Sequence, residues 1–251
     1  MTQAAAALAL AVAFAFPNQD GSRLLATGNI AQPAMLRTAL CSSGQRLAVE
    51  FERRQPEGKD STGRQSSYNF ANLAGAVFRV LGANANPDAS CLVADEAFLA
   101  GTTVVALTRP PQDARCSKAE YPAIQAIKSR PVVACWPIGV SPGGVQVAIV
   151  EFARRLSDAL ASLVVTDGDR RLFVDYPARF NGPGADLWRA DDGGEIHAEG
   201  FEVVCLLKRG STYLLAVDWR GAEGNALSLH IADTGEQFRE VITTSWYRAP
   251  I

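Results

Sequence analysis

The densest group of side chains that could do chemistry lies in an acidic segment at 191–199, with the sequence DDGGEIHAE. Its ionisable members are Asp191, Asp192, Glu195, His197 and Glu199. Carboxylates beside an imidazole can bind a divalent cation or act as a general acid and base. The spacing does not match an EF-hand loop, and Asp-Asp-Gly-Gly is also typical of a solvent-exposed turn. A turn is therefore the favoured interpretation.

The sequence lacks the motifs that assemble a nucleophile or a phosphate-binding loop. No serine stands in a GxSxG elbow, and neither GxxxxGK[ST] nor a dinucleotide fingerprint of glycines occurs. The two histidines are His197 and His230, and the second lies in the alternating run ALSLHIA, where a strand position explains it. We predict no catalytic residue, no metal ligand and no bound cofactor.

The cysteines indicate disulfides rather than a zinc site, because they form no CxxC pair and no cluster with histidine. They are Cys41, Cys91, Cys116, Cys135 and Cys205. In an exported protein, this odd number predicts up to two disulfides and at least one free thiol. Cys135 and Cys205 lie in apolar, strand-like runs, which predicts buried thiols. We expect a disulfide between Cys91 and Cys116.

An unbroken apolar run, Ala4 to Phe16, is followed at once by the polar segment PNQDG. Its 13 residues are too few to cross a bilayer as a helix, but they match the core of a secretory signal, with the AFA triplet at 13–15 as a cleavage site. A standard signal has basic residues before its apolar run, but none precedes this run. The alternative is a first helix or strand that packs on the core. We predict a signal-like segment at 1–16 and a periplasmic or extracellular protein, with a cytoplasmic protein as the alternative.

Composition restricts the class of partner. The chain has a net charge of -2, so it lacks the global positive field that attracts nucleic acid. Apolar residues make up 48% and charged residues 20% of the chain, which is ordinary globular usage. We predict one β-rich domain over 20–251, or two lobes divided near 110–131. We expect no nucleic-acid partner and no stable membrane span in the mature chain.

The strongest local signal is the dipeptide Asp167-Gly168 between the apolar runs at 159–165 and 172–174. Asp-Gly accepts the positive φ angles of a type I′ turn, and such turns match the twist of paired strands. From residue 181 onward, turn signals recur about every ten residues between short apolar runs, as in an antiparallel meander. The predicted fold is mainly β, a meander that forms a sandwich or barrel with one or two short helices.

Two segments fit both a helix and a strand. The valines of 69–82 favour a strand, although its apolar residues also have helical spacing. Residues 145–164 combine strand alternation with a helical stripe. We expect two strands with a turn at 155–158, because the second strand must pair across the Asp-Gly turn. The alternative is an α+β fold with a helix at about 146–164.

Other elements follow from local patterns. Strands are expected at 45–53 and 131–140, and the segments 90–99 and 102–108 are expected to pair with each other. The residues 118–129 form the clearest helix, since a proline suits its first turn. The tryptophans lie in or beside these strands, where core packing explains them, although an aromatic surface for a sugar or peptide would use the same residues. They are Trp136, Trp188, Trp219 and Trp246.

These patterns favour a non-enzymatic, exported binding or interaction protein whose partner is an unidentified protein or small molecule. The first alternative is a carboxylate-type hydrolase centred on the acidic segment. Its Asp191, Glu195 and His197 would have to converge with Asp175 or Asp186. The second alternative is a structural component of an envelope assembly, which would expose a large apolar patch.

Overall fold

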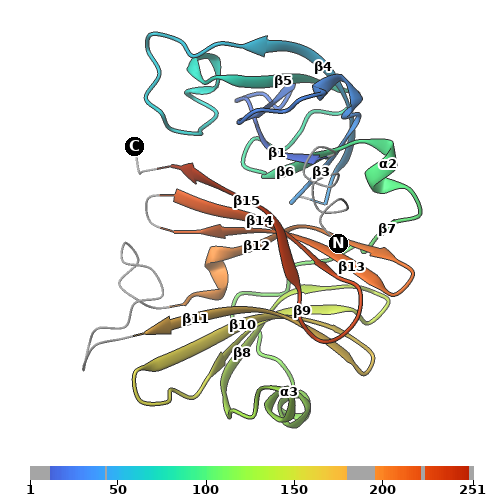
Figure 1. Cartoon of the computed structure of the whole chain (residues 1–251), viewed down its shortest axis with the longest axis vertical. Helices are drawn as coiled ribbons and strands as arrows, with labels where there is room; N and C mark the ends of the chain where they lie inside the picture. The colour runs from blue at the N-terminus through green and yellow to red at the C-terminus, as the bar shows by residue number, and fades with distance from the viewer. Residues whose placement is uncertain (1–11, 43, 180–195, 222–223, 249–251) are drawn as a thin grey trace.

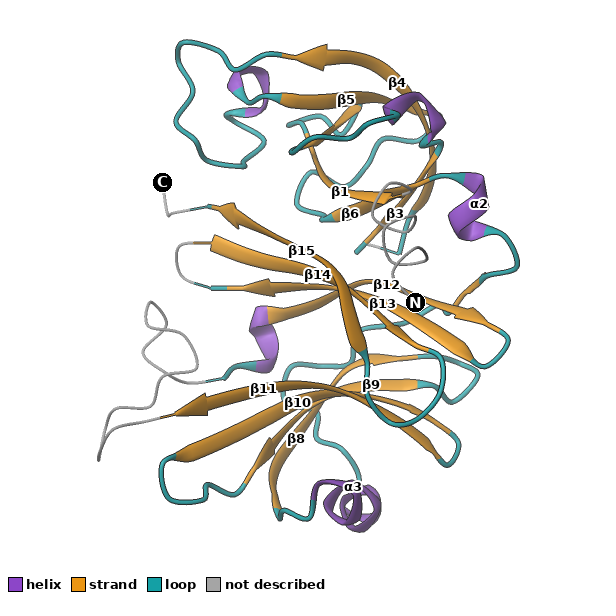
Figure 2. Ribbon diagram, viewed as in Figure 1, coloured by secondary structure: helices purple, strands orange, loops and turns teal. Residues whose placement is uncertain are grey.

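A computed structural model describes residues 12–42, 44–179, 196–221 and 224–248. Its strands form a closed six-stranded barrel, a five-stranded sheet and a four-stranded sheet, stacked along the long axis of the molecule (Figure 1). The helices are short and lie at the margins of this strand framework (Figure 2). The structure confirms the prediction of a mainly antiparallel β fold that contains a barrel and sheets.

The first part of the chain builds the barrel, whose strands follow each other in the order β1-β2-β5-β4-β3-β6. Their bounds are β1 (Val12–Pro17), β2 (Arg23–Ala26), β3 (Thr38–Cys41), β4 (Arg46–Gln55), β5 (Gly75–Leu81) and β6 (Cys91–Ala94). Short 3-10 turns, η1 (Pro33–Met35) and η2 (Phe70–Asn72), interrupt the connections. The barrel contains the strands expected at 45–53 and 69–82.

Strand β1 is buried on both faces, and this explains the apolar run near the start of the chain. Ala13 and Ala15 face the barrel interior, whereas Phe14 and Phe16 pack against the neighbouring sheet. A strand covered on both sides has no polar face. Residues 12–17 therefore form a strand that packs on the core, which was the alternative interpretation of the apolar run. Cleavage after Ala15 would remove the residues of β1 that pair with β6.

The five-stranded sheet lies between the other two layers, with the strand order β15-β14-β13-β12-β7. Its strands are β7 (Thr103–Val104), β12 (Phe201–Arg209), β13 (Thr212–Arg220), β14 (Gly224–Ala232) and β15 (Arg239–Tyr247), and the short turn η4 (Ala198–Gly200) precedes β12. On β13, Leu214 and Ala216 pack against the barrel, whereas Leu215 and Val217 pack against the four-stranded sheet. The predicted C-terminal meander therefore forms a sheet that is buried on both faces.

The four-stranded sheet has the order β11-β10-β9-β8, and its outer face is covered by a helix. The elements are η3 (Lys118–Glu120), α3 (Tyr121–Lys128), β8 (Val132–Val140), β9 (Gln146–Phe152), β10 (Asp158–Asp167) and β11 (Arg170–Arg179). Ile124 of α3 belongs to the core cluster of Phe152 and Phe173. The two strands expected over 145–164 are confirmed, and a helix at 146–164 is not formed. Leu156 makes the turn between them with a positive φ of 52°.

One strand prediction was wrong, because the segments 90–99 and 102–108 do not pair with each other. Strand β6 ends at Ala94, and the helix α2 (Glu96–Leu99) follows. The carboxylate of Asp95 accepts a hydrogen bond of 2.7 Å from the backbone N–H of Phe98, which caps this helix. Strand β7 then pairs with β12 instead.

The hairpin around Gly168 is present, but its turn differs from the predicted type. The register pairs Asp167 with Arg170, so the two loop residues are Gly168 and Asp169. Only Gly168 has a positive φ, 57°. Glycine with positive φ at the first loop position is typical of a type II′ turn rather than type I′.

We expect the substitution Gly168→Val to lower the free energy of unfolding by about 1–3 kcal/mol, because a β-branched residue is strained at positive φ. The measurement is urea denaturation of the purified chain. Asp169→Ala is the matched control, since Asp169 has no positive φ and should cost little. Equal stability of the Gly168→Val and wild-type chains would contradict the described turn.

The disulfides are Cys41–Cys91 and Cys116–Cys135, with Cys205 free and buried. The expected bridge between Cys91 and Cys116 was therefore wrong, as was the expected free thiol at Cys135. Cys41 and Cys91 lie opposite each other on β3 and β6, 4.0 Å apart between Cα atoms. Strand register decides this pairing, and it cannot be deduced from separation along the sequence. Two disulfides are typical of proteins in an oxidising compartment.

Candidate binding cleft

A cleft of 480 Å³ opens between the four-stranded and five-stranded sheets, beside β11, β14 and β15. The β14–β15 connection crosses the edge of β11 at one side of this cleft. There the backbone N–H of Phe173 donates to the carbonyl of Glu236, 2.8 Å, and the N–H of Phe238 donates to the carbonyl of Phe173, 2.9 Å. This connection ties the two sheets together next to the opening.

Three aromatic rings pack together at the cleft. Phe201 and Trp219 are stacked with ring centroids 5.2 Å apart, and Tyr176 meets Trp219 edge-on at 4.9 Å. Strand alternation places Tyr176 and Trp219 on the inner faces of β11 and β13, and both line the cleft. Burial raises the pKa of the Tyr176 hydroxyl well above its ordinary value, and the charge of Glu240 adds to this effect. Tyr176 therefore stays neutral.

Strand β14 contributes a polar pair to the same cleft. Ser228 and His230 are two residues apart, so they share one face of the strand. The Nε2 atom of His230 lies 2.7 Å from the Ser228 hydroxyl oxygen. Burial lowers the pKa of His230 to about 4, so the imidazole is neutral at pH 7.

The Ser228–His230 pair is poorly suited to nucleophilic catalysis. A general base works best when its pKa is near the operating pH, and the imidazolium of His230 is disfavoured by burial. A catalytic histidine is also oriented by a third group. Within the described part of the chain, no carboxylate forms a hydrogen bond with His230. The pair can bind a polar ligand, but the lowered pKa of His230 makes its imidazole a weak base at pH 7.

Two carboxylates reach the cleft, and they differ in their partners. The side chain of Asp175 accepts hydrogen bonds from the Ser162 hydroxyl, 2.5 Å, and from the Lys128 ammonium group, 2.6 Å. Its charge is therefore balanced from the side of α3. Glu240 is exposed on β15 and forms no ion pair with any residue that the structure describes. Glu240 is the carboxylate that is available to a ligand.

The acidic segment of the sequence lies largely outside the described residues. This applies to Asp186, Asp191, Asp192 and Glu195. Glu199 lies in η4, where its carboxylate accepts a hydrogen bond from Gln112, and the first cause of its lowered pKa is a hydrogen bond from its own backbone N–H. His197 precedes this turn. The proposed convergence with Asp175 therefore stays a prediction. No group of three His, Cys, Asp or Glu residues that could hold a metal occurs among the residues placed by the structure.

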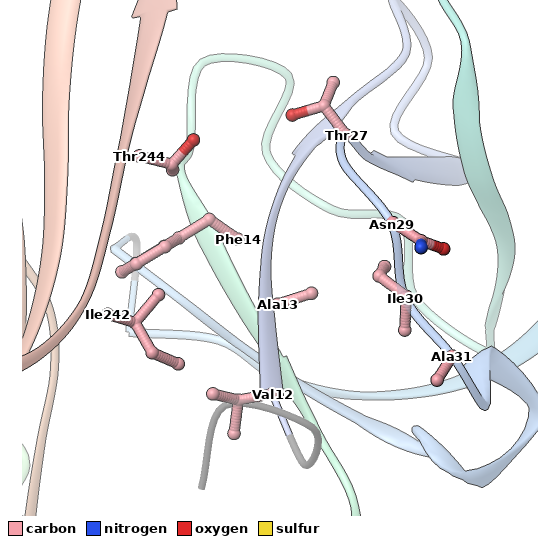
Figure 3. Close-up of a pocket in the computed structure, with 9 residues that line it drawn as sticks. All are labelled: Val12, Ala13, Phe14, Thr27, Asn29, Ile30, Ala31, Ile242 and Thr244. Carbon is pink, nitrogen blue, oxygen red and sulfur yellow. The ribbon is translucent and has the colours of Figure 1, made fainter. Parts of the chain in front are cut away.

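Another hollow, between the barrel and the five-stranded sheet, lacks chemically active groups. It has a volume of 140 Å³, and Figure 3 shows Phe14 of β1 extending toward Ile242 of β15. Its polar lining consists of Thr27, Asn29 and Thr244, and no lining residue titrates near neutral pH. This hollow is a packing gap rather than a candidate site.

Comparisons with known proteins do not indicate what the cleft binds. No family model, curated protein or solved structure gives a significant match. No helix in the described ranges has the length and apolar character needed to cross a membrane. The sequence favoured core packing for Trp219 and offered an aromatic surface only as the alternative, and it did not indicate Ser228 or Glu240. The alternation of the strands can be seen in the sequence. Which face of a strand borders a cleft depends on how two sheets pack, and the sequence does not show this.

Proposed function

We propose that the chain is a non-enzymatic, exported binding protein whose cleft takes a carbohydrate or a related polyol. The observation that carries this proposal is the aromatic cluster of Tyr176 and Trp219 beside the polar groups of Ser228, Thr243 and Glu240. A sugar ring has an apolar C–H face that suits aromatic rings, and hydroxyl groups that suit serine, threonine and carboxylate partners. The volume of 480 Å³ is within the usual range for small-molecule sites.

Several features favour binding over hydrolysis. Glycoside hydrolysis needs two carboxyl groups in distinct roles, one protonated and one ionised. At the cleft, Asp175 is held by Lys128 and Ser162, so Glu240 is the one described carboxylate there that could take such a role. A hydrolase built on the acidic segment would need Asp191, Glu195 or both to enter the cleft, and it remains the alternative hypothesis.

Export is supported by the two disulfides, which fit an oxidising compartment. A structural envelope component is less well supported. Its expected sign is a contiguous apolar surface. The large exposed apolar side chains of the described residues instead belong to separate elements, such as Met35 in η1, Val133 in β8 and Leu156 in the β9–β10 turn.

The test is binding of a panel of monosaccharides and oligosaccharides, screened on a glycan array and measured by calorimetry. We expect Glu240→Gln to weaken the binding of a positive glycan about 10-fold or more, because it replaces a charge-assisted hydrogen bond. Glu236→Gln is the matched control, since Glu236 is exposed on the adjacent connection and does not line the cleft. Absence of binding across the panel, or equal binding by Glu240→Gln, would refute the proposal.

A further inference from the structure

A second large hollow, of 550 Å³, lies where the barrel meets the β13–β14 end of the five-stranded sheet. Three arginines, Arg64, Arg220 and Arg248, line it together with a single carboxylate, Asp88. We propose that this hollow binds the oxyanion group of a ligand, a phosphate or a carboxylate. The site is separate from the cleft between the sheets, and its occupant need not be a carbohydrate.

Arg220 forms the fixed part of this arginine site. Its guanidinium group pairs with Glu202 and approaches the carboxylate of Asp218 at 3.4 Å. Asp218 is fully buried and also accepts hydrogen bonds from the Ser90 hydroxyl, 2.6 Å, and the Asn225 amide, 2.8 Å. The charge of Arg220 is therefore balanced within the protein.

Arg248 forms no ion pair with a described residue, although the charges of Asp218, Glu202 and Asp88 act on its guanidinium group. Its Nε atom is buried and has no hydrogen-bond partner among the residues that the structure places. The guanidinium carbon lies 4.9 Å from the centre of the Trp246 ring, which holds the side chain against the sheet. Burial is the main cause that lowers the pKa of Arg248. Arg248 also lines the hollow, so its guanidinium group can offer a charge-assisted hydrogen bond to an oxyanion there.

The long β4–β5 connection brings further donors to the same hollow. It is anchored on β15, where the N–H of Gln65 donates to the carbonyl of Tyr247, 2.9 Å, and the side-chain oxygen of Gln65 accepts from the N–H of Tyr247, 2.7 Å. This anchor places Arg64 beside the Tyr247 ring at 5.9 Å. The hydroxyl-bearing Ser66 and Ser67 line the hollow next to Arg64.

The charges at this site favour an anion. The positive charge of Arg220 is matched by Glu202 and Asp218. These two carboxylates do not line the hollow, and its described lining carries three arginines and one carboxylate, Asp88. Arginine guanidinium groups and hydroxyls are the donors that suit phosphate and carboxylate oxygens.

The experiment is calorimetric titration of the full chain with inorganic phosphate and, separately, with acetate, at constant ionic strength. Binding of phosphate alone indicates a phosphoryl ligand, and tighter binding of acetate indicates a carboxylate ligand. We expect Arg248→Gln to weaken the binding of the preferred anion about 10-fold or more, as does the loss of a charge-assisted hydrogen bond. Arg179→Gln is the matched control, because the Arg179 side chain is 86% exposed on the four-stranded sheet.

A structural role for Arg248 predicts a different set of results. If the cation over Trp246 were needed for stability alone, Arg248→Gln would lower the unfolding midpoint and leave anion binding unchanged. We expect the opposite, with an unfolding midpoint that is not lowered, since a buried donor without a partner is removed. Arg64→Gln tests the site without altering the buried end of the sheet. We expect it also to weaken binding of the preferred anion. No binding of either anion, or equal weakening by Arg179→Gln, would overturn the proposal.

Discussion

A chain that begins at Phe16 is expected to lose the barrel. It lacks the four residues of β1 that pair with β6, so the barrel can no longer close. It also lacks the buried side chains of Val12 and Phe14, each worth about 1.5–3 kcal/mol of burial. Together with the lost strand pairing, this approaches the whole stability of a typical domain, about 5–15 kcal/mol.

Circular dichroism and urea denaturation measure this effect, with a chain that begins at Val12 as the matched control. The control retains β1 and should unfold near the wild-type midpoint. A stable, cooperatively folded chain that begins at Phe16 would contradict the role assigned to β1. Intact-mass measurement of protein from a secreting host addresses the predicted cleavage site at 13–15, because processing there would produce the chain without most of β1.

Loss of the Cys41–Cys91 disulfide is expected to destabilise the chain more than loss of Cys116–Cys135. The bridges close loops of 50 and 19 residues, respectively. Loop-closure entropy then gives about 4 kcal/mol for the first and about 3 kcal/mol for the second. Cys41 and Cys91 also lie inside the barrel, so replacing both with alanine leaves unfilled space there.

Urea denaturation of the two double alanine variants measures the order of these effects. Cys205→Ala is the control, because this thiol forms no disulfide and burial raises its pKa to about 12, which keeps it unreactive. Peptide mapping under non-reducing conditions tests the pairing itself. A peptide that links Cys91 to Cys116 would contradict the structure and support the pairing expected from the sequence.

Predictions from the sequence were correct where a turn fixed the positions of the two strands that it joins. The hairpin at Gly168 required a strand before it, and this requirement decided the ambiguous segment 145–164 correctly. For β1 the sequence left two interpretations, a signal-like segment and a strand on the core, because a strand buried on both faces shows no alternation. The strand prediction was wrong for α2, because Asp95 caps a helix within a run whose apolar residues also fit a strand.

The disulfides and the cleft depend on contacts between distant segments, which local patterns do not contain. Cys41 and Cys91 meet through the register of β3 and β6, two strands that are not consecutive in sequence. The cleft combines Tyr176, Trp219 and Glu240 from three strands in two sheets. Each residue had an ordinary structural explanation by itself, and only the packing of the sheets brings them together.

The double burial of the five-stranded sheet links the two candidate sites thermodynamically. One face of the sheet shares a core with the barrel and the other shares a core with the four-stranded sheet, so separating either neighbour exposes apolar surface of the same strands. Unfolding of one layer therefore removes the support of the next, so we expect the three layers to unfold together. A ligand that binds only the native state then stabilises the three layers as a whole, whichever hollow it occupies. One melting transition can thus report occupancy of both sites, and the site variants are needed to assign the signal.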